Sequence, residues 1–145
     1  MRVAIAIDPG LTRALASLRK PALHATFRDA LMHAAYEVQR IATQEKIRRG
    51  GVVGKGKERT ILPPLPDRLT SRTGSLRRSI GVDRSELPFA ISIGTELVYG
   101  RVHETGGRFG RATYPPRPFL APALEDVAPK FETFFARALQ RAAGV

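Results

Sequence analysis

The chain has 145 residues, of which 43% are hydrophobic, and its 24 Lys and Arg against 13 Asp and Glu give a formal net charge of +11. This length fits one domain with one core, so we expect residues 1–145 to form a single domain. The chain contains no cysteine, which excludes a disulfide framework and a thiolate metal site and is compatible with assembly in the cytoplasm.

The N-terminal residues predict a short strand and then a short helix. Hydrophobic residues alternate with Ala over residues 3–7, which is typical of a strand with one buried face. Asp8 and Pro9 suit the N-cap and first turn of a helix that runs to about Arg19. The apolar run at 3–7 is too short to span a membrane, so we expect this protein to have no membrane partner.

The strongest helical pattern follows. Hydrophobic residues recur at spacings of three and four and predict a long amphipathic helix that ends near Arg49. Gly50 and Gly51 come next and are expected to terminate it as a C-cap. The predicted buried stripe consists of Leu23, Phe27, Ala30, Ala34, Val38 and Ile41.

Residues 50–66 have no hydrophobic period and contain four glycines and three prolines. We expect a flexible, basic and proline-rich loop here, because long loops inside a compact domain are usually functional or disordered. We also expect it to be poorly ordered in the isolated subunit and to become ordered against a neighbour.

Basic residues concentrate in the middle of the chain. Twelve basic and four acidic residues lie between Arg40 and Arg84, so this third of the chain carries +8 of the net +11. Such a concentration attracts polyanions, although a solvated basic loop is an equal alternative. Because Arg40 to Arg84 contains no aromatic residue, any DNA contact would be to phosphates and not to bases. The candidates for facing a polyanion are Lys46, Arg48, Arg49, Lys55, Lys57 and Arg59.

The second half of the chain predicts short elements. Thr73 is the expected N-cap of a brief helical turn that sets Leu76 and Ile80 on one side. Residues 80–83 and 89–94 are predicted strands, and the residues between them form a turn.

Two further helices are expected towards the C-terminus. Residues 97–105 predict a short helix closed by two glycines, and residues 108–112 a basic turn. The last helix begins at Pro118, and Pro129 should kink it or split it in two. The order of elements predicts an α+β domain: a small antiparallel β-sheet packed by a long N-terminal helix and a C-terminal helix, with a long basic loop.

No catalytic constellation is found in the sequence. His103 and Glu104 begin like the helix of a zinc protease, but the second His is missing and only His24 and His33 occur elsewhere. No Ser lies in a nucleophile elbow, and the glycines and lysines at 54–57 lack the spacing of a phosphate-binding loop. We therefore expect no enzymatic activity, no cofactor and no metal, and keep a hydrolase that uses His103 and Glu104 only as a minor alternative.

Three motifs occur in order in the second half. Residues 72–80 read Arg-Thr-Gly-Ser-Leu-Arg-Arg-Ser-Ile, residues 93–106 contain Ile-Gly-Thr, Val-Tyr-Gly and His-Glu-Thr-Gly, and residues 116–124 read Pro-Arg-Pro-Phe-Leu-Ala-Pro-Ala-Leu. This combination resembles the neck and minor tail proteins of long-tailed bacteriophages, which are described as tail-completion or head-tail joining proteins. The chain departs from the family pattern at Gly100, where Ala is usual, and at Thr105, where Phe is common.

The resemblance implies a non-enzymatic structural protein of the virion, assembled in the host cytoplasm. It implies a ring, with six copies expected, around the DNA channel between the portal and the tail tube. The partners implied are further copies of this chain, neighbouring neck and tail-tube or tail-terminator proteins, and double-stranded DNA in the channel. The alternative is a free basic nucleic-acid-binding protein that contacts phosphates nonspecifically.

Residues 98–124 are expected to form a structural corner that fixes the fold and contacts other subunits. Two glycines allow the chain to reverse, and the prolines at 115–118 stiffen the approach to the last helix. Arg117 is a candidate to pair with Glu104 or with a neighbouring subunit, and a solvated Arg117 is an equal alternative. The candidate residues of the corner are Tyr99, Glu104, Gly106, Arg117, Pro118 and Phe119.

Overall fold

The computed structural model describes residues 1–6, 8–10, 12–13, 21–48, 52–54, 56–58, 60–61, 65 and 68–143. The helix expected from Asp8 to about Arg19 lies mostly outside these residues. Asp8 Oδ1 accepts a hydrogen bond from the Gly10 N–H at 2.8 Å, as a helix-capping side chain does. No described helix is long and apolar enough to cross a membrane.

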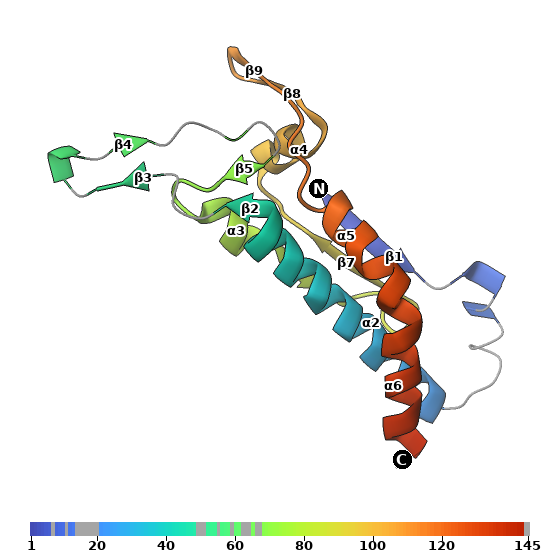
Figure 1. The fold of residues 1–145 in the computed structure, drawn as a ribbon. Helices are drawn as coiled ribbons and strands as arrows, with labels where there is room; N and C mark the ends of the chain where they lie inside the picture. The colour runs from blue at the N-terminus through green and yellow to red at the C-terminus, as the bar shows by residue number, and fades with distance from the viewer. Residues whose placement is uncertain are drawn as a thin grey trace.

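The sheet is antiparallel and three-stranded, in the order β1–β7–β6 (Figure 1). Its strands are β1 (Arg2–Ala6), β7 (Ala90–Gly94) and β6 (Gly81–Asp83). Val3 of β1 pairs with Ile93 and Ile5 pairs with Ile91, and both partners on β7 are fully buried. The expected alternation of β1 is confirmed for residues 2–6, because residues 3 and 5 are half-buried and 2, 4 and 6 are exposed.

The long helix is α2 (Pro21–Ile41), which continues as one π-helical stretch, η1 (Ala42–Lys46). Of its predicted stripe, Leu23 is half-buried and the other five residues are buried, so the pattern is confirmed. The predicted end near Arg49 is three residues too late, and the C-cap expected at Gly50 and Gly51 lies outside the described residues. The helix ends at Lys46, since Ile47 enters the core on the extended strand β2 (Ile47–Arg48).

The C-terminal segment is split at Pro129, as expected. It consists of α5 (Ala121–Val127), the 3₁₀ turn η3 (Ala128–Lys130) and α6 (Phe131–Ala143). Proline lacks the N–H that a continuous helix would need at this position. The predicted start at Pro118 is three residues too early.

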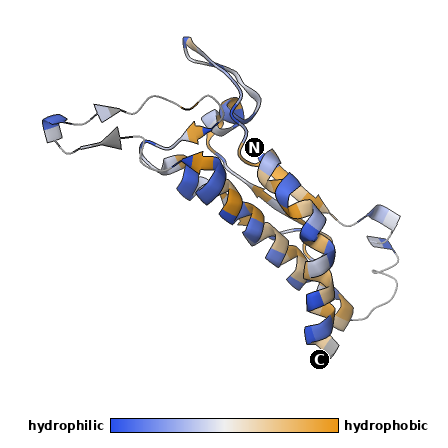
Figure 2. Cartoon of the chain, in the orientation of Figure 1, coloured by the Kyte–Doolittle hydropathy of each residue, from blue (hydrophilic) through white to orange (hydrophobic). Residues whose placement is uncertain are grey.

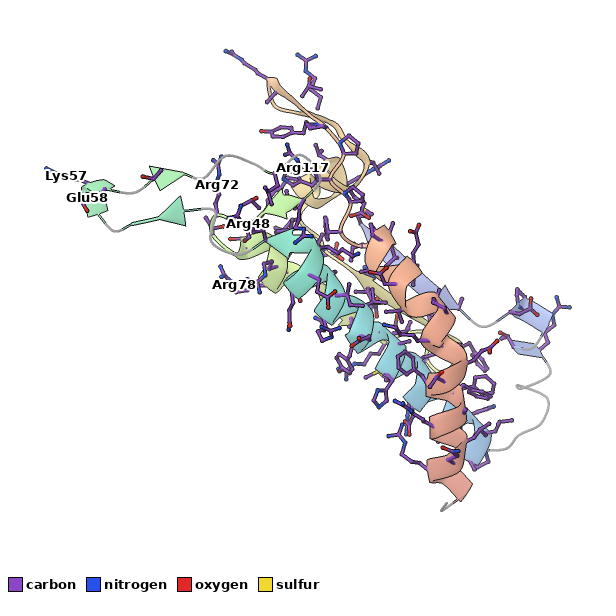
Figure 3. The ribbon with its side chains drawn as sticks, viewed as in Figure 1. Arg48, Lys57, Glu58, Arg72, Arg78 and Arg117 are labelled. Carbon is purple, nitrogen blue, oxygen red and sulfur yellow. The ribbon has the colours of Figure 1, made fainter. Side chains whose placement is uncertain are left out.

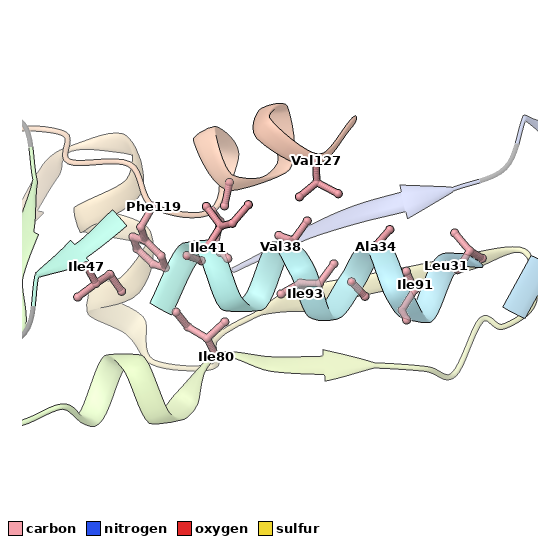
Figure 4. Close-up of a cluster of buried hydrophobic side chains, with 14 of the residues drawn as sticks. Leu31, Ala34, Val38, Ile41, Ile47, Ile80, Ile91, Ile93, Phe119 and Val127 are labelled. Carbon is pink, nitrogen blue, oxygen red and sulfur yellow. The ribbon is translucent and has the colours of Figure 1, made fainter. Parts of the chain in front are cut away.

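The core lies where α2 packs against the sheet and against α5 and α6 (Figures 1 and 4). The rings of Phe27 on α2 and Phe135 on α6 have centroids 4.6 Å apart. Figure 2 shows hydrophobic residues where these elements face one another and hydrophilic residues on the outer helix surfaces. The α+β architecture predicted from the sequence is therefore confirmed.

Two hairpins project from this body (Figure 1). In the first, β3 (Val52–Val53) pairs antiparallel with β4 (Thr60–Ile61), with the 3₁₀ turn η2 (Gly56–Glu58) at its tip. These residues belong to the segment expected to be a flexible, basic and proline-rich loop, and all four paired residues are β-branched, which suits a strand. In the second, β8 (Gly107–Phe109) pairs with β9 (Ala112–Tyr114) where only a turn was expected.

Three short elements connect the hairpins to the body. Strand β5 (Leu69–Thr70) pairs parallel with β2, and α4 (Val98–Thr105) matches the helix expected at 97–105. The N-cap of α3 (Ser75–Ser79) is Gly74, with φ of 78°, and not Thr73 as predicted. A glycine suits this left-handed conformation, and the Thr73 hydroxyl instead accepts a hydrogen bond from the Ser75 N–H at 3.3 Å.

Candidate functional site

The first two sequence motifs meet through a relay of hydroxyl groups. Ser79 Oγ, at the end of α3, donates to the Leu76 carbonyl at 2.8 Å and lies 2.6 Å from Thr95 Oγ1, just after β7. Thr95 Oγ1 also accepts the Leu97 N–H at 3.1 Å. Because each hydroxyl has one proton, Thr95 donates to Ser79 and Ser79 donates to Leu76. The relay fixes the entrance of α4 against α3.

Gly100 sits against this relay on α4. A β-carbon at this position would lie 2.5 Å from Thr95 Cγ2 and 3.4 Å from Leu76 Cδ1. The 2.5 Å distance to Thr95 is too short for a β-carbon unless α4 or Thr95 shifts. The fully buried side chain of Thr95 therefore gives a steric reason for glycine at position 100.

Glu104 joins the second motif to the third. Its side chain is buried, with 6% of the residue exposed, and accepts three backbone N–H groups. Oε2 accepts from Phe119 at 2.8 Å and Leu120 at 3.0 Å, and Oε1 accepts from Ala121 at 2.7 Å. These N–H groups lie just before α5 or at its first residue and have no acceptor inside the helix. Glu104 therefore caps the N-terminus of α5 by accepting their hydrogen bonds.

This arrangement corrects one expectation about Arg117. The two oxygens of Glu104 are taken by backbone donors, and Arg117 forms no ion pair with Glu104. Arg117 instead donates its backbone N–H to the His103 carbonyl at 2.7 Å. Its guanidinium Nε is buried and has no hydrogen-bond partner among the described residues. The use of both Glu104 oxygens also argues against the minor alternative in which Glu104 acts as a base.

A pocket of about 400 Å³ adjoins this corner. Its lining comes from the β2–β5 pair, the turn before α3, α3 itself, α4, β9 and the segment that follows β9. Within the part of the chain that the structure describes, no Asp or Glu lines it. The residues that line it are Ile47, Leu69, Thr70, Ser71, Arg72, Thr73, Ser75, Leu76, Tyr99, His103, Tyr114 and Arg117.

His103 lies between two tyrosine rings of this pocket. Its ring centroid is 6.0 Å from that of Tyr99 and 5.7 Å from that of Tyr114, both edge-on. Burial lowers the pKa of His103 below its ordinary value, and the positive charge of Arg117 lowers it further. The lining therefore contains two cationic groups, Arg72 and Arg117, and Arg117 lies near an imidazole that resists protonation.

The candidate polyanion-facing residues separate in the structure. Lys46 pairs with Asp126 of α5 at 2.7 Å, which ties η1 to the body. Arg48 is exposed at the base of the β3–β4 hairpin, and Lys57 is exposed at its tip (Figure 3). Arg49, Lys55 and Arg59 lie outside the described residues. Arg48 and Lys57 thus remain exposed candidates, whereas Lys46 is already paired.

Sequence reasoning did not select two other exposed arginines near the hairpin base, Arg72 and Arg78 (Figure 3). Arg78 lies over Gly74, where a β-carbon would come 2.7 Å from its Nη1. The only signal for them was their inclusion in the basic third of the chain. Neighbouring Arg77 differs, because its Nε donates to the Thr43 carbonyl at the end of the long helix at 2.7 Å.

The corner residues expected to contact other subunits are mostly structural. Phe119 is fully buried in the core, and Gly106, with φ of 73°, packs against Pro116. Pro118 is exposed, and Tyr99 is half-buried in the pocket wall. The described ranges contain no group of three or more His, Asp or Glu side chains that could hold a metal ion.

Comparison of the chain with protein-family models, curated proteins and solved structures found no match.

Proposed function

We propose that the protein is a non-enzymatic structural protein of a tailed-phage particle, acting at the head-tail joint as a tail-completion or minor tail component. In this role copies of the chain form a ring, with six expected, around the DNA channel. They contact neck and tail-tube or tail-terminator proteins and assemble in the host cytoplasm. In a defective prophage or a gene-transfer particle the role would be the same.

The observation that carries this proposal is the order of the three motifs together with their mutual contacts. Ser79 of the first motif bonds to Thr95 of the second, and Glu104 of the second bonds to Phe119 of the third. Because residues of different motifs bond to one another, the fold itself requires the three motifs to occur together. The resemblance to the tail-completion family then supplies the function, which is an argument by analogy.

The shape of the chain supports self-association. The β3–β4 hairpin extends from the body (Figure 1), and an isolated two-stranded hairpin is only marginally stable in water. Its outer strand edges offer unpaired N–H and C=O groups to another chain. A ring in which each hairpin lies on a neighbouring copy would stabilise the hairpin.

Exposed cations near the hairpin support contact with DNA through phosphates. Arg48, Arg72 and Arg78 lie around its base, and Lys57 lies at its tip (Figure 3). None of the four forms an ion pair with an acidic side chain in the described part of the chain. Contacts of this kind carry no sequence information, which suits a channel through which any genome must pass.

Electron microscopy of particles that lack the gene tests the proposal. We expect DNA-filled heads and separate tails, and joined virions again when the wild-type gene is supplied in trans. Native mass spectrometry of the purified protein adds an independent measurement, in which a closed ring should appear as one dominant oligomer. Normal joined virions without the gene would refute the role.

The second candidate, a free nucleic-acid-binding protein, rests on the same exposed cations. It predicts tight binding of the isolated monomer to duplex DNA at physiological salt, with affinity falling steeply as salt rises. A gel-shift titration across salt concentrations separates the two functions. Weak binding of the monomer, together with strong binding of the oligomer, would favour the ring.

A further inference from the structure

The pocket beside the corner contains polar groups that the fold itself does not satisfy. Three buried side-chain atoms of the described residues lack a hydrogen-bond partner: Thr70 Oγ1, His103 Nδ1 and Arg117 Nε. All three residues line this one pocket, although they come from β5, α4 and the segment before α5. Buried polar groups in folded proteins are almost always paired, so three unpaired groups around a single cavity need an explanation.

The charged side chains that line the described part of the pocket are all positive. Arg117 is half-buried and Arg72 is exposed, so they present positive charge inside the pocket and at its open side. Neither arginine forms an ion pair with any described acidic residue, and the described residues that line the pocket include no Asp or Glu. The Thr70 hydroxyl is unpaired and can donate to an anion. The Thr73 and Ser75 hydroxyls lie 2.9 Å apart and bond to each other, so only one of their two protons is left for an anion.

We propose that this pocket is a binding site for a carboxylate, held by the guanidinium groups of Arg117 and Arg72 and by the Thr70 hydroxyl. This site goes beyond the proposed virion role and does not depend on it. A planar guanidinium matches the two oxygens of a carboxylate, and such charge-assisted bonds are stronger than neutral ones.

The shape of the pocket favours a carboxylate on a slim stem over a phosphate of duplex DNA. Arg117 is half-buried among the lining residues, so a carboxylate on a slim, flexible stem can approach its guanidinium more closely than a phosphate on a wide, rigid duplex can. The walls also contain the apolar side chains of Ile47, Leu69 and Leu76, which are buried and suit methylene groups. A volume of about 400 Å³ accommodates a group the size of a glutamate side chain with room to spare.

Two sources could supply this carboxylate: an acidic side chain of another polypeptide, or a free small carboxylate. The probes are therefore acetate, glutarate and a capped Gly-Glu-Gly peptide, with inorganic phosphate for comparison. Each is titrated into the full chain at constant ionic strength, and the Nε–H resonance of Arg117 is followed by arginine-selective NMR. We expect a saturable shift of this resonance with at least one carboxylate and little change at Arg78.

Calorimetry on variants tests which residues carry the binding. Arg117→Gln should weaken carboxylate binding by about tenfold or more, because a charge-assisted hydrogen bond is lost. Arg72→Gln should weaken it several-fold, and since Arg72 is exposed this variant tests the site even if Arg117→Gln fails to fold. Arg78→Gln removes the same charge from an exposed arginine that does not line this pocket and should bind like the wild type.

The outcomes divide cleanly. Peptide binding that is about tenfold tighter than acetate binding assigns the carboxylate to a polypeptide, whereas equal binding assigns it to a free small molecule; both support the site. The proposal is overturned if no carboxylate gives a saturable shift, if phosphate binds more tightly than every carboxylate, or if both Arg117→Gln and Arg72→Gln bind like the wild type.

Discussion

Glu104 and Phe119 are joined by a hydrogen bond in which Glu104 Oε2 accepts the backbone N–H of Phe119 at 2.8 Å, with both residues buried. The same carboxyl group accepts the N–H groups of Leu120 and Ala121. One side chain of α4 thereby holds the segment that starts α5, and Phe119 is directed into the core beneath it.

Replacing Glu104 by Gln should destabilise the protein by about 2 kcal/mol, because the amide NH₂ cannot accept a backbone N–H and leaves one buried donor unpaired. Urea unfolding followed by circular dichroism measures the change. Glu125→Gln is the matched control, since Glu125 on α5 is exposed and makes the same change of charge. A loss for Glu104→Gln no larger than for the control would contradict the capping role.

Phe119→Ala should cost about 3–5 kcal/mol, because the ring is fully buried and its removal leaves a cavity. The free energy of unfolding is again the measurement. Affinity of the folded variant for duplex DNA should stay unchanged, since the exposed cations lie on other residues. A fall in DNA affinity at temperatures where the variant remains folded would show that this prediction is wrong.

Gly100→Ala should destabilise the protein by about 1–3 kcal/mol through the contact with Thr95 Cγ2. Thr95→Ser removes that methyl group but keeps the hydroxyl that bonds to Ser79 and Leu97. The double variant should therefore lose less than the sum of the two single variants. A double-mutant cycle of unfolding free energies measures this coupling, and strict additivity would refute the steric explanation.

Stability should fall in mildly acid solution partly because of His103. Burial and the charge of Arg117 hold the pKa of folded His103 below its ordinary value of 6.5, so the unfolded chain binds the proton more readily. Its contribution is constant above about pH 6.5 and is lost as the pH falls below that value. The difference in unfolding free energy between the wild type and His103→Gln should narrow or reverse from pH 7.5 to pH 5. If the unfolding free energies of the wild type and His103→Gln change in parallel with pH, His103 does not contribute to the loss of stability.

Residues 50–66 should gain hydrogen-exchange protection when the chain assembles. The described β3–β4 pairs belong to a projecting hairpin with few contacts to the body, and such segments open easily when isolated. Mass spectrometry of exchange in the monomer and in the assembly measures the protection of this segment, with α2 as an internal reference. Equal protection in both states would show that no neighbour covers the hairpin.

The sequence alone determined the elements whose signal is local. The stripe on α2 repeats every three or four residues, and the alternation in β1 and β7 repeats every two, because burial of one face is enough to impose these periods. Pro129 splits the last helix whatever surrounds it. The turn at 108–112 was predicted but the strands beside it, β8 and β9, were not, although Gly110 stands between Phe109 and Ala112, where the hairpin turn needs a residue that adopts a positive φ.

The tertiary structure decided the features that join distant segments. Ile47 leaves the helix because the core has a place for it beside Leu69, and no local pattern marks that point. Arg117 was a candidate to pair with Glu104, but Glu104 instead accepts three backbone N–H groups at the start of α5. These N–H groups have no partner inside the helix, and the buried carboxyl group supplies one for each of them. Thr70, His103 and Arg117, each with an unpaired buried atom, line one pocket because the fold brings three separate segments together. Their spacing along the sequence does not predict that they lie close in space.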